Sequence, residues 1–339
     1  MYGKMKGKIV FADILEHVES LDVKTASHID GNNLVIAIVT PVAERVHQLV
    51  PQSGEIAFMD ASGGMDRYGT QVVMIMTHTP LGGGLPLGSI FLTSKKSEHM
   101  KKGLTMLSDL LGGNAFYGRG KNGPCVFMTD HCEAERKAIR EVYPTSTPLL
   151  CAFHILQAFW RFLWDKQSGV EKGDRPHIFN LMKGLLYAES VPQLEDKYNI
   201  MQSAIVAQNP AVQDHLTKYW SMKEDWALAL RQDMLVRGSN TNNIVECCFR
   251  SLNDKILRRQ KCFNVVQLLN YTAVFVSKYF CRKLLQLISN PGAAAASSSS
   301  RKALMKGAEI SSEGITYIEG DTNKILTHYV DTSIGTCTA

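Results

Sequence analysis

Short apolar runs separated by turn residues predict a series of buried strands in the first third of the chain. The runs LVIAIV (residues 34–39) and EIAFMD (55–60) are short and rich in β-branched or aromatic residues, as buried strands are. Two more strands are predicted from Thr70 (TQVVMIMTH) and Leu87 (LGSIFLTS), each after a segment of turn residues. The last three strands are joined by short turns, which predicts an antiparallel meander.

Helices and strands alternate in the segment that follows. Ser97 is suited to capping a helix, and apolar residues recur after it at helical spacing, at Met100, Leu104, Leu107 and Leu111. PCVFMTD predicts a strand ending at Asp130, EAERKAIREVY predicts a helix stopped by Pro144, and TPLLCAFH predicts a strand that runs into another helix. Three strands followed by helix, strand, helix and strand is the order of the ribonuclease-H-like mixed α/β sheet.

The second half of the chain is predicted to be helical. Residues 155–239 carry helical periodicity with almost no strand signal, which indicates an all-helical insertion. The segment SNTNNIVECCFRSLNDKIL begins with capping residues and continues as an amphipathic helix. Glu246 lies on the flank of the apolar face of this helix, which consists of Ile244, Cys248, Phe249, Leu252 and Ile256. A last helix is predicted over residues 263–289.

These elements predict four segments along the chain. Residues 1–50 form an N-terminal extension, and residues 51–290 form one α/β domain that includes the helical insertion. The small-residue stretch NPGAAAASSSSRK contains a predicted linker, residues 291–300. Residues 301–339 are too few for an independent core.

Three acidic residues are candidates for one site. Asp60 and Asp130 each end a strand, and in the predicted sheet the first and fourth strands are neighbours, which brings the two aspartates side by side. Glu246 reaches the same region from the helix after the insertion. Carboxylates held together repel one another unless a cation neutralises them, and oxygen ligands suit Mg²⁺ or Mn²⁺. Two such ions would serve an in-line phosphoryl transfer.

Each acid also has an ordinary structural interpretation. An aspartate at a strand end is often a turn former, and Asp130 is placed to cap the helix that follows it. Glu246 alone is typical of a solvated helix surface. The spacing of the three residues therefore leaves both interpretations open.

Composition describes an ordinary globular protein with a weak preference for anionic partners. Apolar residues make up 45% and charged residues 20% of the chain, and the net charge is +5. No apolar run approaches the roughly 20 residues that cross a bilayer, and the apolar run near the N-terminus is too short for a signal peptide. The 8 cysteines are scattered, so we expect a reducing compartment rather than a disulfide framework.

Four stretches of the chain together resemble the MULE transposase domain of Mutator-like elements. They are FMDASGG around Asp60, FMTDHCEAERKAIREVYP around Asp130, CAFHILQAFWR after it, and SNTNNIVECCFRSLNDKI around Glu246. The stretches occur in the order of the family, with a helical segment before the glutamate, and span roughly residues 50–260.

The resemblance implies a ribonuclease-H-like fold and a DDE triad formed by Asp60, Asp130 and Glu246. In the family such a triad binds a divalent metal, Mg²⁺ or Mn²⁺, and cleaves and joins DNA strands at transposon ends. The expected partner is double-stranded DNA of the transposon ends and the target. We further expect a homo-oligomer in the nucleus without membrane association.

The resemblance also covers a Cys-x-x-His step, Cys151 and His154, with Trp160 downstream. A packed cysteine and a hydrogen-bonded histidine at a strand-to-helix junction are one interpretation of this pair. By resemblance, the pair lies near the active site as orienting or DNA-contacting residues. Two ligands do not complete the four of a structural zinc site, so we expect no structural zinc in this chain.

The C-terminal segment, residues 301–339, ends in HYVDTSIGTCTA. Cys337 fits the first ligand of the SWIM zinc finger that many family members carry, but Ala339 stands where the second cysteine would come. We therefore expect this finger to be absent or truncated.

A basic run, KILRRQK, follows the third acid and supplies the candidate DNA contacts Lys255, Arg258, Arg259 and Lys261. Charge runs are usually solvated, but beside a metal site that handles DNA such residues are also suited to contacting phosphates.

Three functions are compatible with these patterns. The first is the catalytic core of a Mutator-like DDE transposase, and intact acids at all three positions favour it. The alternative is a domesticated, catalytically silent protein that retains the fold for DNA binding or regulation. A ribonuclease H or exonuclease of the same fold would lack the helical insertion and the Cys-x-x-His step.

Overall fold

The structure of the chain, a computed structural model, describes residues 23–79, 83–203, 209–262 and 264–289 and the backbone of four short strands beyond them. Residues 1–22 of the predicted N-terminal extension and the predicted linker, residues 291–300, lie outside the described residues. The same holds for the side chains of the predicted C-terminal segment, residues 301–339.

The chain divides into two compact units, which are described separately. The first comprises Met1–Thr147 and Asn242–Glu309, and the second comprises Pro148–Thr241 and Ile310–Ala339. All three predicted metal ligands therefore belong to the first unit, whereas the Cys-x-x-His pair belongs to the second. The expected division into a catalytic domain and a helical insertion stays a prediction.

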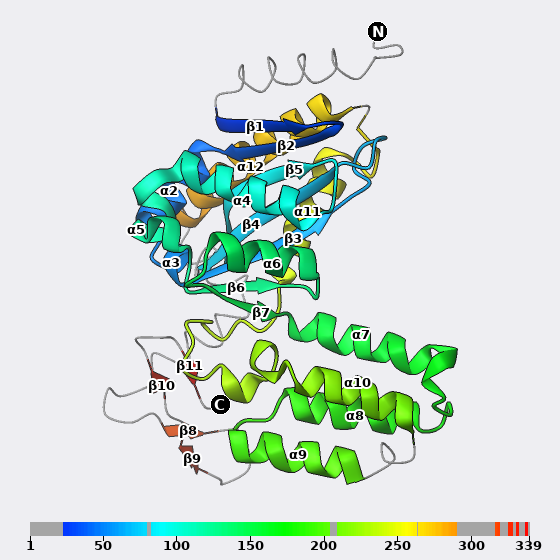
Figure 1. The fold of residues 1–339 in the computed structure, drawn as a ribbon. Helices are drawn as coiled ribbons and strands as arrows, with labels where there is room; N and C mark the ends of the chain where they lie inside the picture. Colours follow the sequence, from blue (N-terminus) through cyan, green and yellow to red (C-terminus); the bar gives the residue numbers. More distant parts are fainter. Residues whose placement is uncertain are drawn as a thin grey trace. The chain divides into compact units, whose positions relative to one another are not determined.

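The structure contains a seven-stranded mixed sheet with the order β1-β2-β5-β4-β3-β6-β7, and β1 to β6 belong to the first unit (Figure 1). β3 and β6 are parallel, whereas β1–β2, β2–β5, β5–β4 and β4–β3 are antiparallel. The predicted antiparallel meander is therefore present, and its first strand lies beside the strand that ends before Asp130. The strands are β1 (Lys24–Asp30), β2 (Asn33–Val39), β3 (Ile56–Ser62), β4 (Gln71–Thr79), β5 (Gly83–Leu92), β6 (Val126–Thr129) and β7 (Thr147–Leu150).

Helices complete the first unit as a mixed α/β structure. α4 and α6 lie over the near face of the sheet in Figure 1, and α12 runs behind it. Close approach of α4 depends on Gly103, where a Cβ atom would lie 2.5 Å from Ile90 Cγ2. The helices are α2 (Pro41–Leu49), α3 (Gln52–Glu55), α4 (Ser97–Leu111), α5 (Ala115–Gly118), α6 (Glu133–Val142), α11 (Asn243–Ser251), a π-helical turn (Leu252–Ile256) and α12 (Val265–Ser289), with short 3-10 turns at Gly112–Asn114 and Gly120–Asn122.

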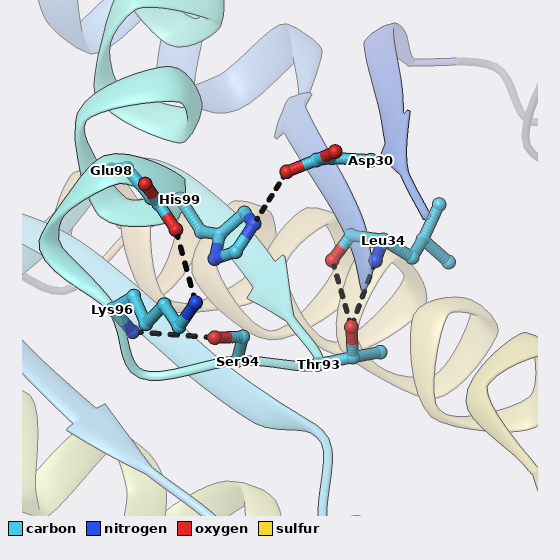
Figure 2. A network of polar contacts seen from close by, with 7 residues as sticks. All are labelled: Asp30, Leu34, Thr93, Ser94, Lys96, Glu98 and His99. Atoms are coloured by element: carbon cyan, nitrogen blue, oxygen red, sulfur yellow. Dashed lines mark hydrogen bonds and ion pairs between the residues drawn. The ribbon is translucent and has the colours of Figure 1, made fainter. Parts of the chain in front are cut away.

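The N-terminal hairpin, β1 and β2, extends the sheet beyond the predicted meander. Figure 2 shows how polar contacts attach it: the N–H of Leu34 donates to Thr93 Oγ1 at 2.8 Å, and Asp30 Oδ2 lies 3.5 Å from His99 Nε2 at the start of α4. Lys96 and Glu98 form an exposed ion pair in the same network. β2 is buried over its apolar residues, so the hairpin is part of the core of this unit.

The second unit contains helices in residues 152–230 and short strands in residues 316–337. Its helices pack around a buried cluster that includes Phe159, Met182, Leu216 and Trp226. They are α7 (Ala152–Trp164), α8 (Arg175–Leu186), α9 (Val191–Ser203) and α10 (Pro210–Trp220), with 3-10 turns at Lys166–Ser168, Lys223–Asp225 and Leu228–Leu230. The short strands β8 (Thr316–Ile318) and β9 (Ile325–Thr327) pair with each other, as do β10 (Val330–Asp331) and β11 (Thr336–Cys337).

Among the helices that the structure describes, none combines the length and the apolar character needed to cross a bilayer.

Candidate active site

Asp60 and Asp130 lie at corresponding positions on adjacent parallel strands. β3 pairs with β6 so that Ile56 faces Val126 and Phe58 faces Met128. Two residues further on, the same register places Asp60 beside Asp130, which directly follows the last residue of β6. Neighbouring strands are about 4.8 Å apart, so this register carries the two residues to nearby positions at the same end of the sheet. Within the described residues, the close group of possible metal ligands contains Asp130 but neither Asp60 nor Glu246, so the expected convergence of the three acids stays a prediction.

Backbone hydrogen bonds orient both carboxylates. The N–H of Ala61 donates to Asp60 Oδ1 at 2.8 Å, and the N–H of Cys132 donates to Asp130 Oδ1 at 3.1 Å. Both aspartates are half-buried. Cys132, not Asp130, occupies the cap position of α6, and that cap carries no side-chain hydrogen bond. Asp130 thus fixes the turn before α6 without capping the helix in the usual manner.

Glu246 lies in the first turn of α11, which packs on the face of the sheet toward which Asp60 points. Asp60 pairs with Met74 across β3 and β4, and the Sδ atom of Met74 is 3.3 Å from the Sγ atom of Cys248 in α11. Cross-strand partners share a face, so α11 covers the face that carries the Asp60 side chain. Glu246 is half-buried on this helix, in agreement with its expected place on the flank of the apolar face.

Glu135 is a fourth acidic residue at this site, and the sequence interpretation missed it. It lies in the first turn of α6 and is only 3% exposed. One ligand atom from each of Asp130, Cys132 and Glu135 lies within 4.8 Å of the others. Burial raises the pKa of the Glu135 carboxyl well above its usual value, and the charges of Asp130 and Asp60 raise it further.

A signal for Glu135 was present in the sequence. Glu135, Ala138, Ile139 and Val142 recur at the spacing of one helix face, and Ala138 and Ile139 are fully buried. A glutamate on the apolar stripe of a short helix is unusual. Acidic residues are common in the first turn of a helix because the helix dipole stabilises negative charge there. This common role gave no reason to consider Glu135 as part of a site.

Cys132 completes this group as a thiol. Burial raises its pKa, as do the neighbouring carboxylates of Glu135 and Asp130. The thiol form is a poor ligand for hard cations such as Mg²⁺, which prefer oxygen.

The loop after β3 is held by a buried aspartate that is not available for metal. Asp66 is fully buried, and its Oδ1 accepts the N–H groups of Tyr68 at 3.1 Å and Thr70 at 2.9 Å. Its Oδ2 accepts the Thr70 hydroxyl at 2.5 Å. The N–H of Cys262 donates to the carbonyl of Met65 at 2.7 Å, which ties this loop to the segment after α11.

A basic pocket lies between these two segments. It is lined by Gly64, Met65, Arg250, Asn253, Asp254, Arg259, Gln260 and Lys261. Arg259 donates to Asp254 Oδ1 at 2.8 Å. Arg258 and Arg259 have φ values of 50° and 60°, a left-handed conformation that costs free energy in residues other than glycine and is concentrated at functional sites.

The four candidate DNA contacts are distributed around this pocket. Arg259 and Lys261 line it, and both are exposed. Arg258 is exposed at the start of the left-handed turn but is not part of the lining. Lys255 is also exposed, and its Nζ lies 5.0 Å from the centre of the Tyr279 ring.

The Cys-x-x-His residues lie at the start of α7 in the second unit. Cys151 is fully buried at the cap position, and Arg231 Nη2 donates to the carbonyl of Leu150 beside it at 2.6 Å. His154 is half-buried one turn later, with its ring 5.5 Å from that of Phe153. Within the described residues, the pair does not belong to a group of three or more ligand side chains. Its expected role near the active site stays a prediction.

Trp160 has a packing role in the second unit. Its ring lies 5.1 Å from that of Phe179 and 5.8 Å from that of Trp164. These contacts place it against the helical core.

Comparison with known families identifies a transposase domain in part of the chain. Residues 58–158 match the MULE transposase domain, so the resemblance inferred from the sequence motifs is confirmed for this segment. The matched segment contains Asp60, Asp130, Glu135 and the Cys-x-x-His pair, whereas Glu246 and the basic run lie beyond it. No curated protein matches the chain.

Proposed function

Starting from the MULE transposase domain at residues 58–158, we propose that this chain is the catalytic core of a Mutator-like DDE transposase. It would cut DNA strands at transposon ends and join them to a target, with Asp60, Asp130 and Glu246 as the triad. The observation that supports the proposal is the parallel register of β3 and β6, which continues toward Asp60, two residues before the end of β3, and Asp130, directly after β6.

The arrangement of elements supports a ribonuclease-H-like fold for this core. The strands from β3 to β7 have the spatial order β5-β4-β3-β6-β7, with a meander on one side of β3 and parallel β6 on the other. α11 returns to the sheet after the helices of the second unit and brings Glu246 to the face that carries Asp60. A helical insertion before the last acid is consistent with this connection.

The donor set fits Mg²⁺ or Mn²⁺. Asp60, Asp130 and Glu246 offer carboxylate oxygens, the ligands that these ions prefer. Burial is the main cause of the raised pKa of Glu135, and the charges of Asp130 and Asp60 raise this pKa further; a cation would neutralise those charges. When bound, two such ions would stabilise the attacking and leaving oxygens of an in-line phosphoryl transfer. The bonds from Ala61 and Cys132 hold the two aspartates in a fixed orientation for this role.

DNA would reach the site along the basic pocket. Arg250, Arg259 and Lys261 place cationic groups at or after the helix that carries Glu246. Such groups attract the phosphate backbone without reading its sequence. Double-stranded DNA as the partner, assembly as a homo-oligomer and location in the nucleus follow from the same proposal.

Nicking of a supercoiled plasmid by the full chain in Mg²⁺ or Mn²⁺ tests the triad. Asp60→Asn, Asp130→Asn and Glu246→Gln should each abolish nicking, because metal binding requires the charge. The three residues act as a unit, so a double substitution should cost little beyond a single one. Asp109→Asn, which changes an exposed acid on α4, is the matched control and should leave nicking intact.

Two results would change the proposal. Nicking by Glu246→Gln at the wild-type rate would remove Glu246 from the site. DNA binding by the wild-type chain with no nicking in either metal would favour the domesticated, catalytically silent protein.

A further inference from the structure

Glu135 occupies a position that is costly without a positive partner. Its side chain is 3% exposed, and Oε2 is buried without a hydrogen-bond partner in the described part of the chain. A buried polar atom without a partner destabilises the folded protein, and a charged group does so more strongly than a neutral one. The adjacent Arg136 has its Nη1 atom 3.7 Å from Oε2 of Glu133.

Two acidic residues lie near Glu135. A carboxylate oxygen of Glu135 lies within 4.8 Å of one from Asp130, and Asp60 is close enough to influence it electrostatically. Packing two like-charged groups and an unpartnered oxygen together is unfavourable unless a cation binds among them. Mg²⁺ takes six oxygen ligands, of which several are usually waters, so the shell has room for a further carboxylate in place of a water.

We propose that Glu135 is a fourth carboxylate ligand, which holds a divalent cation together with Asp130 on the α6 side of the site. This inference rests on the proposed metal-dependent function and assigns a residue that the triad does not include. α6 would then supply one ligand and α11 another, so that the ions are held between two helices and the ends of two strands. The cation would be coordinated by Oε2 of Glu135, the oxygen that has no hydrogen-bond partner.

Binding of Mn²⁺ to the full chain tests this assignment without a need for DNA or activity. Free Mn²⁺ is measured by electron paramagnetic resonance during titration, and metal-induced thermal stabilisation is measured in parallel. Glu135→Gln should weaken Mn²⁺ binding by at least about tenfold, since even outer groups around a metal account for about 10–100-fold. The metal-free melting temperature of this variant should be unchanged or higher, because it removes repulsion and keeps the shape.

Matched variants separate Glu135 from its neighbours. Glu133→Gln changes an exposed acid in the same helical turn and should bind Mn²⁺ like the wild type. Cys132→Ser should also bind normally, because the ligand atoms are oxygens. Glu135→Asp retains a carboxylate and should bind more tightly than Glu135→Gln, which covers the case in which the glutamine variant folds poorly.

The outcomes distinguish the inference from the function on which it rests. If Asp130→Asn loses Mn²⁺ and Glu135→Gln binds it as the wild type does, Glu135 is not a ligand and only the inference fails. If the wild type binds no Mn²⁺, the metal-dependent function fails with it.

Discussion

The Sγ atom of Cys248 lies 3.3 Å from the Sδ atom of Met74, the cross-strand partner of Asp60. This sulfur contact places α11 directly above the strand next to the first aspartate. The position of Glu246 therefore depends on how closely α11 approaches the sheet.

Gly84 controls that approach. A Cβ atom at this position would overlap with Ile244 Cγ2 in α11 and would lie 3.1 Å from Met76 Cε. We expect Gly84→Ala to destabilise the protein by about 1–3 kcal/mol, as overpacking usually does. It should also reduce metal-dependent nicking, because α11 moves away from the sheet. Urea unfolding and plasmid nicking are the measurements.

A second substitution provides the control for steric overlap. Ile244→Ala should restore part of the stability and activity of Gly84→Ala, because it removes the overlapping methyl group. Gly113→Ala, where a Cβ atom would meet nothing within 4 Å, should change neither. Equal loss in the double variant would show that the overlap is not the cause.

His47 is predicted to make stability depend on pH. It is fully buried, accepts the N–H of Phe116 at Nδ1 and bonds to the carbonyl of Leu87 through Nε2, and burial lowers its pKa from 6.5 to about 4. The unfolded chain takes up a proton below pH 6.5 while the folded chain does not, so the free energy of unfolding falls as the pH drops from 6.5 toward 4. Relative to pH 7, the contribution of His47 to the free energy of unfolding should be lower by about 2 kcal/mol at pH 5.

Urea unfolding of the wild type and His47→Gln at pH 7 and pH 5 measures this contribution. Glutamine retains a donor and an acceptor but does not titrate, so the variant should lose less stability on acidification. The comparison between the two proteins cancels the carboxylates that titrate in both. Identical pH dependence would exclude His47 as the source.

The basic run is predicted to bind DNA through phosphates. Replacement of both Arg258 and Arg259 by glutamine should reduce the slope of log K against log salt by about one unit for each phosphate that the variant no longer neutralises. Lys102→Gln, an exposed change on α4, is the matched control and should leave the slope unchanged. An unaltered slope in the double variant would mean that these arginines are simply solvated.

Purified protein is predicted to contain no stoichiometric zinc. Cys151 and His154 supply two ligands, whereas a structural zinc site needs four. Elemental analysis after dialysis against a mild chelator is the measurement. One tightly bound zinc per chain would contradict this expectation and would assign the Cys-x-x-His pair to a metal site.

Local sequence patterns predicted the helices and strands that depend mainly on neighbouring residues. The helix expected after Ser97 and the last helix, expected over residues 263–289, are present as Ser97–Leu111 and Val265–Ser289. Ser97 itself begins the helix, and Lys96 holds the cap position without a side-chain hydrogen bond. β5 starts at Gly83, four residues before the predicted start at Leu87. The sequence pattern places the start too late because the first residues of the strand include glycine and Pro86, which are uncommon inside strands.

Contacts between segments that are distant in the sequence were harder to predict. The apolar run at residues 34–39 identifies a strand, but its pairing of Val35 with Leu92 depends on the whole sheet and leaves no local signal. β1 has the mixed sequence KTASHID and is largely exposed, so no apolar run identifies it. In the site, the nearby positions of Asp60 and Asp130 at the same end of the sheet followed from strand order, whereas Glu135 required knowledge of which side of α6 is buried.

The hairpin of β1 and β2 has a consequence for the solubility of shorter fragments. Without it, β5 would be the edge of the sheet, with unpaired backbone groups beside buried apolar side chains such as Ile90 and Phe91. Exposed edges of this kind promote self-association, whereas β1 ends the sheet with half-exposed and charged residues. A fragment restricted to residues 58–158 would therefore aggregate, although it contains the segment that matches the MULE transposase domain.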